Sequence, residues 1–251
     1  QVYSAGAIYL ADNAPSLLRG WRTFTATAPD EITSQALLWS IPAIPDFPEE
    51  LHHAPCVIIA GLYAGPAEDG PAAFAPLSAL GEPLADISGV STYVEAQSAF
   101  DAHFPSGGNY YWKSHFLDSL SDDAVDAICA AHASTPSPLS VFALRHMGGA
   151  ISRKPEDATA YANRNAQYNL SLDAIWADPA DSARNIAWVR QAWDDLRPHA
   201  NGGVYLNFAG LVEDADALAQ AGHGRNIERL REVKRRYDPH NRFRGNVNIA
   251  P

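Results

Sequence analysis

Hydrophobic and polar positions alternate at the start of the chain, over residues 2–10, as in a strand with one buried face. A nearly continuous apolar run over residues 55–63 indicates a strand at the centre of a sheet or covered on both faces. Apolar residues recur three or four positions apart elsewhere, which predicts helices. The pattern predicts further strands over residues 32–41, 108–116, 139–146 and 168–176 and around Tyr205, and helices over residues 13–28, 65–80, 93–100, 121–133, 179–196 and 225–237.

The order of these elements predicts one α+β domain over residues 1–251. No linker, repeat or low-complexity segment divides the sequence, and its length suffices for a substantial core. We expect an antiparallel sheet of about six or seven strands with helices mainly on one face. Such a sheet leaves its other face free for a partner or a ligand.

Composition narrows the class of protein. The chain is 47% hydrophobic and 19% charged, as soluble globular proteins are. Its net charge of −11 argues against nucleic acid or an anionic membrane as a partner. No apolar run is long enough to span a bilayer, and the nine histidines form no metal-ligand pattern, so we expect no membrane segment and no metal. The compartment stays open, with the cytoplasm slightly favoured.

The last fifty residues carry three short motifs in a fixed order. These are Tyr-x-Asn at 205–207, Tyr-Asp-Pro-x-Asn-x-Phe at 237–243, and Asn-x-Asn-Ile at 246–249. Together they resemble the C-terminal berberine-bridge segment of FAD-linked oxidases in the vanillyl-alcohol oxidase superfamily, which would be residues 202–251 here. Residues 106–114 and 147–153 are similar to the substrate domain of the same enzymes, so the resemblance covers most of the chain.

The resemblance implies FAD as the cofactor, bound mainly by an N-terminal domain that this sequence does not contain. That domain would be a partner in the same or a separate chain, and the isolated chain is expected to be redox-inactive. The implied activity is oxidation of an alcohol, amine or phenolic small molecule, with hydride passing to the flavin and then to oxygen. The alternatives are a flavin-free relative that binds or cyclises a biosynthetic intermediate, and a module that docks on a flavin domain.

Tyr205 is the predicted catalytic residue. The resemblance implies that it is, or assists, the base that deprotonates a substrate hydroxyl, and that Asn207, Asn246 and Asn248 contact the flavin. In a strand, Tyr205 and Asn207 would point to the same face. A phenol has a pKa of about 10, so a neighbouring charge would have to lower it for base catalysis at neutral pH. A purely structural tyrosine and asparagine is the alternative.

Substrate contacts are predicted in an aromatic strand. Alternation sends Tyr111 and Lys113 to one face and Tyr110 and Trp112 to the other. We assign the first pair to the substrate cavity and the second pair to the core, with core packing as the alternative for Tyr111.

Three further residues are predicted to bind substrate: His146, Arg164 and Tyr168. His146 precedes a Gly148-Gly149 interruption, which indicates a bulge, a sharp bend or the close approach of a ligand ring. Many members of the family have His-Arg where this chain has Asn163-Arg164, so a histidine role is absent there. An ion pair is the alternative role for Arg164.

Overall fold

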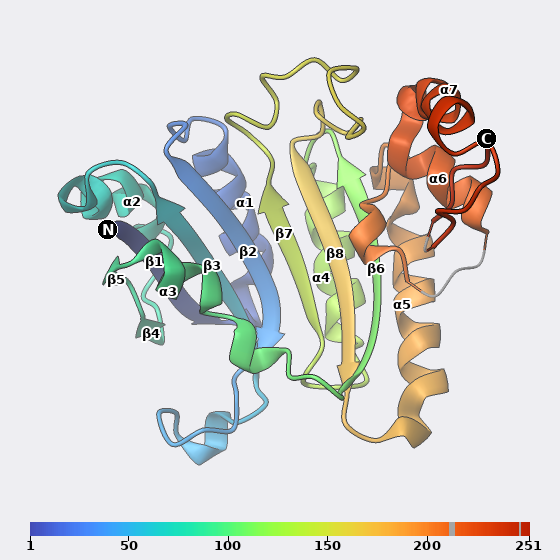
Figure 1. Ribbon diagram of the computed structural model, residues 1–251. Helices are drawn as coiled ribbons and strands as arrows, with labels where there is room; N and C mark the ends of the chain where they lie inside the picture. Colours follow the sequence, from blue (N-terminus) through green and yellow to red (C-terminus); the bar gives the residue numbers. More distant parts are fainter. Residues whose placement is uncertain (211–213, 246) are drawn as a thin grey trace.

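The computed structural model describes residues 1–210, 214–245 and 247–251. Its described strands form one eight-stranded antiparallel sheet in the order β4-β1-β3-β2-β7-β8-β6, with β5 paired to β1 (Figure 1). The strands are β1 (Val2–Leu10), β2 (Ile32–Ser40), β3 (Pro55–Tyr63), β4 (Ala85–Asp86), β5 (Gly89–Ser91), β6 (Asn109–Leu117), β7 (Val141–His146) and β8 (Tyr168–Trp176).

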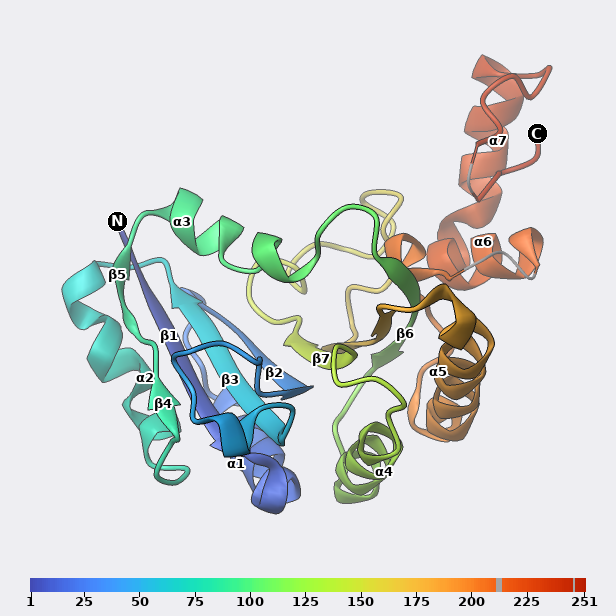
Figure 2. The same ribbon diagram turned by 90° about the horizontal axis from the view of Figure 1, so that it is seen from below.

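The helices lie mainly on one face of this sheet, which we call the helix-covered face. Figure 2 shows α1, α4 and α5 together on one side of the strands, whereas α3 lies on the other, helix-free side. Among these described helices, none has the length and apolar character needed to cross a membrane. They are α1 (Ala14–Thr25), α2 (Gly70–Ser78), α3 (Tyr93–Ser98), α4 (Asp122–Ala133), α5 (Ser182–Leu196), α6 (Ala215–His223) and α7 (Ile227–Tyr237).

The main hydrophobic core lies between the strands and the helices of the helix-covered face. Helix α1 contributes a stripe that includes Leu18 and Trp21, both fully buried. The Trp21 indole donates a hydrogen bond of 3.1 Å to Ser34 Oγ on β2, which satisfies its polar edge inside the core. Helix α4 begins after Ser121, whose hydroxyl accepts from the backbone of Ala124 and caps the helix.

Strand β8 shows how alternation divides the sheet into two faces. All of its residues are buried. Its apolar side chains at every second position join the core beneath the helices. The positions between them carry Asn169, Ser171 and Asp173, which therefore lie on the helix-free face. The sequence thus places three polar groups in a row on the face that the helices do not cover.

The fold prediction is confirmed, with local exceptions. The predicted strand around Tyr205 is wrong, because residues Leu206–Phe208 form a short 3₁₀ turn. The backbone amide of Tyr205 donates a hydrogen bond of 3.0 Å to Ser114 Oγ on β6. This amide therefore bonds to a side chain, whereas in a strand it would bond to the backbone of a neighbouring strand. The pattern of hydrophobic and polar positions did not predict helix α6 or the two short strands β4 and β5.

Two buried histidines on the helix-covered side predict a loss of stability in acid. Burial is the main cause that lowers the pKa of His115 and of His132 to about 4 each. The folded chain therefore binds fewer protons than the unfolded chain between pH 4 and about 6.5. Each histidine stabilises the fold above that window, and this contribution is lost as pH falls through it, at up to about 1.4 kcal/mol per pH unit.

Urea unfolding at several pH values measures this effect. We expect the free energy of unfolding of a His132→Gln variant to fall less steeply with acidification than that of the wild type. Asp173 acts in the opposite direction, because burial raises its pKa to about 7, but it is present in both proteins and cancels in the comparison. Equal slopes for the two proteins would contradict the assignment.

Candidate functional site

A buried polar cluster occupies the middle of the helix-free face. We define it as Arg145 on β7 together with Ser171 and Asp173 on β8. Arg145 Nη1 donates to Ser171 Oγ at 2.8 Å, and Ser171 Oγ donates to Asp173 Oδ2 at 3.0 Å. The Ser171 hydroxyl thus links the Arg145 guanidinium to the Asp173 carboxyl group. An unpaired charge shielded from water would destabilise the fold.

Burial changes the proton affinity of both charged members of the polar cluster. It raises the pKa of Asp173 to about 7, with Arg145 and Ser171 acting in the opposite direction. It lowers the pKa of Arg145, an effect that the charges of Asp173 and Tyr205 oppose. Asp173 is therefore a carboxyl group that can take up or release a proton near neutral pH.

An aromatic turn, residues 205–208, lies against the polar cluster. The Phe208 ring centroid is 5.6 Å from that of Trp112 and 5.1 Å from that of Tyr205, both in edge-to-face geometry. The Arg145 guanidinium carbon lies 5.2 Å from the centroid of the Phe208 ring. Phe208 thus connects the cation of the polar cluster with the tyrosine that the sequence predicts to be catalytic.

Tyr205 and Asn207 are in direct contact although they do not lie in a strand. Asn207 Nδ2 donates to the Tyr205 phenolic oxygen at 2.8 Å. Tyr205 is half-buried and Asn207 is exposed, so the phenol is held at the surface of the helix-free face and is not sealed in the core.

Some buried polar atoms near this site have no hydrogen-bond partner among the described residues. They include the Trp112 indole nitrogen, Asp173 Oδ1 and the Tyr161 hydroxyl. Trp112 and Asp173 are direct partners in the register of β6 and β8, and Tyr161 packs edge-on against Phe116 of β6 at 6.2 Å. A bound ligand with donors and acceptors would satisfy these atoms, and the aromatic turn beside them suits a flat polar ring.

Tyr111 and Lys113 lie on the other face of the sheet from Tyr205. Tyr111 is 2% exposed and belongs to the main core, and Arg190 of α5 donates to its hydroxyl at 3.2 Å. Lys113 Nζ lies 4.1 Å from the centroid of the Trp193 ring, also on α5. The two pairs of the aromatic strand separate as alternation predicts, but their assignment is reversed: Trp112, not Tyr111, lies beside the aromatic turn.

His146 and Tyr168 also lie on the helix-covered side. Their ring centroids are 5.9 Å apart. The Tyr168 hydroxyl is 2.7 Å from Thr25 Oγ1, and its ring packs against Trp21 of α1 at 5.5 Å. These contacts separate both residues from Tyr205 by the thickness of the sheet.

Arg164 lies closer to the site. Its guanidinium carbon is 5.2 Å from the centroid of the Tyr161 ring, and it donates to Ile151 O and to Thr159 Oγ1. Asn248, predicted to contact flavin, has a buried amide oxygen without a partner in the part of the chain that the structure describes. Asn246 lies outside the described residues.

The sequence prediction missed Arg145, Asp173 and Phe208. The signal was present in the two strands: Arg145 interrupts an apolar run, and polar residues occupy every second position of β8. Charged side chains at such positions within buried strands are rare without a partner, so they mark a candidate site. In the described part of the chain, no group of three or more acidic, histidine or cysteine side chains could hold a metal ion.

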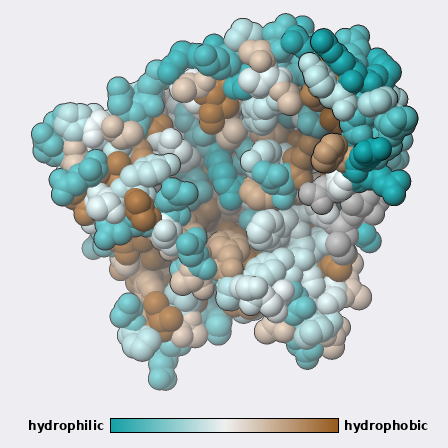
Figure 3. Space-filling model, in the orientation of Figure 1, coloured by the Kyte–Doolittle hydropathy of each residue, from teal (hydrophilic) through white to brown (hydrophobic). Residues whose placement is uncertain are grey.

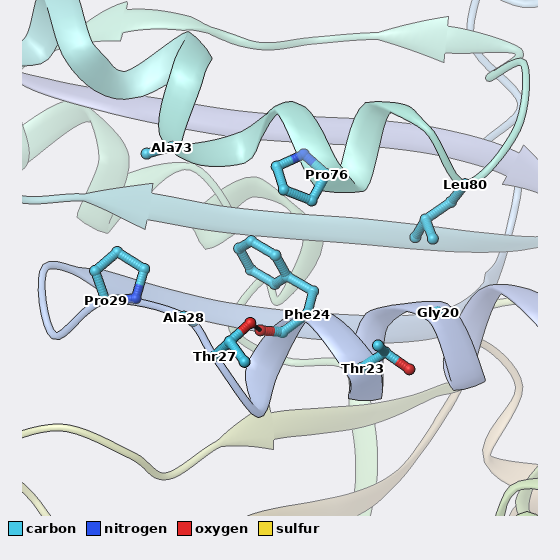
Figure 4. A pocket seen from close by; sticks show the side chains of 9 residues that line it. All are labelled: Gly20, Thr23, Phe24, Thr27, Ala28, Pro29, Ala73, Pro76 and Leu80. Carbon is cyan, nitrogen blue, oxygen red and sulfur yellow. Dashed lines mark hydrogen bonds between the residues drawn. The ribbon is translucent and has the colours of Figure 1, made fainter.

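The site does not coincide with the hollows on the helix-covered side. One hollow of about 420 Å³ lies between α1 and α2, with Phe24, Pro76 and Leu80 among its lining residues and no titratable group (Figure 4). By contrast, Figure 3 views the helix-free face, which is hollowed along its middle and mixes hydrophilic with hydrophobic atoms there. Chemistry requires polar groups that converge, so we place the candidate site on the helix-free face.

Comparisons with known proteins find similarity to FAD-linked oxidoreductases. The berberine and berberine like family matches residues 204–250. An FAD-linked oxidoreductase of Dictyostelium discoideum is 26% identical over 234 residues, which cover 90% of this chain and 50% of that protein. An uncharacterised FAD-linked oxidoreductase of Bacillus subtilis is 25% identical over 245 residues, which cover 96% of this chain and 51% of that protein.

Solved structures share the fold. The structure of BBE-like 1 from Physcomitrella patens aligns with a TM-score of 0.79 and 17% identity, and the alignment covers 100% of this chain and 54% of that one. The resemblance drawn from the sequence motifs is therefore confirmed. The chain is similar over most of its length to berberine bridge enzyme-like FAD-linked oxidoreductases, and it spans about half the length of the relatives that it matches.

Proposed function

We propose that this chain is the substrate-binding and C-terminal portion of an FAD-dependent oxidoreductase that oxidises an alcohol, amine or phenolic small molecule. The observation that carries the proposal is the hydrogen-bonded pair of Tyr205 and Asn207 on the helix-free face. Near this pair lie a half-buried cation, Arg145, and a buried carboxyl group, Asp173, whose pKa burial raises to about 7. A half-buried phenol in such surroundings can exchange a proton with a substrate hydroxyl.

In this proposal Tyr205 acts as a phenolate, which accepts the proton of the substrate hydroxyl and becomes a neutral phenol while the substrate becomes an alkoxide. Asn207 fixes the phenolic oxygen by donating to it, so the lone pairs of that oxygen are held in one direction. Trp112 and Phe208 form apolar walls that exclude water from the reacting groups. A bound FAD would supply the acceptor for hydride from the substrate carbon and the route for the electrons to oxygen.

The residues that would contact the flavin ring are those of the aromatic turn and the C-terminal tail. Asn207 is exposed next to Tyr205, and Asn248 has an unpartnered amide oxygen among the described residues. Amides of this kind bind the donors and acceptors along the edge of a flat heterocycle. An FAD-binding domain in the same or a separate chain would hold the rest of the cofactor, and the helix-free face is the surface against which we expect it to dock.

Flavin absorbance tests the proposal. The 251-residue chain alone is expected to show no band at about 450 nm, whereas the protein that joins it with an FAD-binding half is expected to show one. Anaerobic addition of alcohols, amines and phenols should bleach that band with at least one class. An assembled protein that retains no flavin would contradict the proposal and favour a flavin-free protein that binds or cyclises a small molecule.

A further inference from the structure

The segment between β5 and β6 crosses the helix-free face of the sheet. Strand β5 pairs with β1 near one edge, and β6 forms the opposite edge, so residues 92–108 run from one side of the sheet to the other. Figure 1 and Figure 2 show this path in green, through α3 and over the side that α1, α4 and α5 do not cover. We call residues 92–108 the strap.

Two phenylalanine rings attach the strap to the sheet. Phe100 and Phe104 are half-buried, whereas most other residues of the strap are exposed. Both rings pack on a cluster of buried apolar residues of the helix-free face, which are Leu37, Val141, Ala143 and Ile175. Near the end of the strap, the Tyr110 hydroxyl donates to Pro105 O at 2.5 Å. The strap is thus held against the face by apolar contact and by a hydrogen bond.

Phe104 lies over the row of side chains that contains Asp173. Its ring centroid is 6.4 Å from that of Trp39 on β2 and 6.1 Å from that of Trp112 on β6. Between these two strands, the register pairs Val141 of β7 with Asp173 of β8, and Asp173 with Trp112. Asp173 is 4% exposed. A ring that contacts tryptophans on both sides of this pair helps to shield the carboxyl group from water.

Two buried polar atoms in this row have no hydrogen-bond partner among the described residues. They are the Trp112 indole nitrogen, which is a donor, and Asp173 Oδ1, which accepts when the carboxyl group is ionised. A hydroxyl group both donates and accepts, so a ligand hydroxyl would satisfy both atoms. Trp112 contacts Phe104 of the strap and also Phe208 of the aromatic turn. A ligand bound at these atoms would therefore meet the strap as well as the aromatic turn.

We propose that Phe104 is a specificity-determining residue, whose ring limits the size of the small molecules that can reach Trp112 and Asp173. The proposal rests on the proposed function in taking this part of the helix-free face as the substrate cavity. Small substrates fit beneath the ring, whereas larger ones require the strap to leave the sheet and to lose its apolar contacts. Phe104 acts by its shape and exchanges no proton with the substrate.

Phe100 is the matched control for Phe104. It is a phenylalanine of the same strap, and it packs on the same apolar cluster. Its ring centroid lies 6.4 Å from that of His103, which belongs to the strap itself. Phe100→Ala therefore loosens the strap but keeps the ring that lies against Trp112.

The first test measures access to Trp112 in the 251-residue chain. The tryptophans are labelled with ¹⁵N, and loss of an indole NMR signal in Trp112→Phe identifies Trp112. TEMPOL, a neutral nitroxide with one ring, broadens the signals of the groups that it reaches. We expect several-fold more broadening of the Trp112 signal in Phe104→Ala than in the wild type or in Phe100→Ala. Equal broadening in folded Phe104→Ala and the wild type overturns the proposal, and Phe104→Leu, which keeps more apolar surface, replaces a variant that does not fold.

The second test measures size selection in the FAD-loaded protein by anaerobic flavin bleaching. The substrates are whichever of benzyl alcohol, benzylamine and phenol reacts fastest, and its bulkier para-benzyloxy derivative. The ratio of kcat/KM for the larger to the smaller molecule should rise at least about tenfold in Phe104→Ala and stay near the wild-type value in Phe100→Ala. An unchanged ratio despite better access to Trp112 overturns the proposal. If none of these molecules bleaches the flavin, the result counts against the proposed function, and the broadening by TEMPOL decides the role of Phe104.

Discussion

Replacing Tyr205 with phenylalanine is expected to slow substrate oxidation by about 10²- to 10⁴-fold, the range that general base catalysis contributes. The substitution removes only the phenolic oxygen, to which Asn207 donates at 2.8 Å. The ring contact with Phe208 at 5.1 Å can remain, so the aromatic turn should keep its shape. The measurement is the rate of anaerobic flavin bleaching in the FAD-loaded protein, at saturating concentrations of its best substrate.

Tyr63→Phe is the control for this experiment. Tyr63 packs against the core of the helix-covered side, on the opposite face from the site, so the loss of its hydroxyl should leave the rate unchanged. A fall in affinity for substrate with an unchanged bleaching rate in Tyr205→Phe would assign the phenol to binding and not to proton transfer. A rate within a few-fold of wild type would remove Tyr205 from the mechanism.

Hydrophobic periodicity predicted the strands that carry the site because each has a buried face along its whole length. The 55–63 run became β3, an inner strand between β1 and β2, and the 168–176 run became β8 with the same bounds. Strands β4 and β5 are held to the sheet by pairing with β1 and have no periodic pattern of their own. Their existence depends on contacts distant in sequence, which a local pattern does not contain.

The candidate site shows a different limit of the sequence. Alternation placed Tyr111 with Lys113 on one face and Tyr110 with Trp112 on the other. It did not tell which of these two faces the helices cover. The packing of α5 decides this, since its Arg190 and Trp193 meet Tyr111 and Lys113. The choice therefore required tertiary structure.

The motif around Tyr205 was informative even though its secondary structure was wrong. A strand brings residues two apart to one face, and the observed turn brings Tyr205 and Asn207 together by a direct hydrogen bond. Arg145 and Asp173 come from two different strands, and only their pairing across β7 and β8 unites them. When several elements together form a site, the sequence shows its residues only one by one. Here the signal is a charged residue within an otherwise apolar strand, which is rare.

Phe142→Ala is expected to lower the free energy of unfolding by about 3–5 kcal/mol, as large-to-small substitutions of buried aromatic residues do. Phe142 is fully buried on β7, where its ring stacks on Trp188 of α5 at 5.2 Å and meets His132 of α4 at 5.4 Å. The truncation removes apolar contact and leaves a cavity between the sheet and two helices. Urea unfolding measures the change as a lower transition midpoint with an unchanged slope.

The matched control uses the same substitution at the surface. Phe243 is 82% exposed, and its recorded hydrogen bonds are made by the backbone, with Asp238 and Lys234. Phe243→Ala should therefore change stability by less than about 0.5 kcal/mol. Arg145 lies on the same strand as Phe142 but faces the helix-free side. Phe142→Ala therefore also tests how far the core packing of β7 stabilises the strand that carries the candidate site. Similar losses in both variants would mean that the sheet and helices do not pack as a single core.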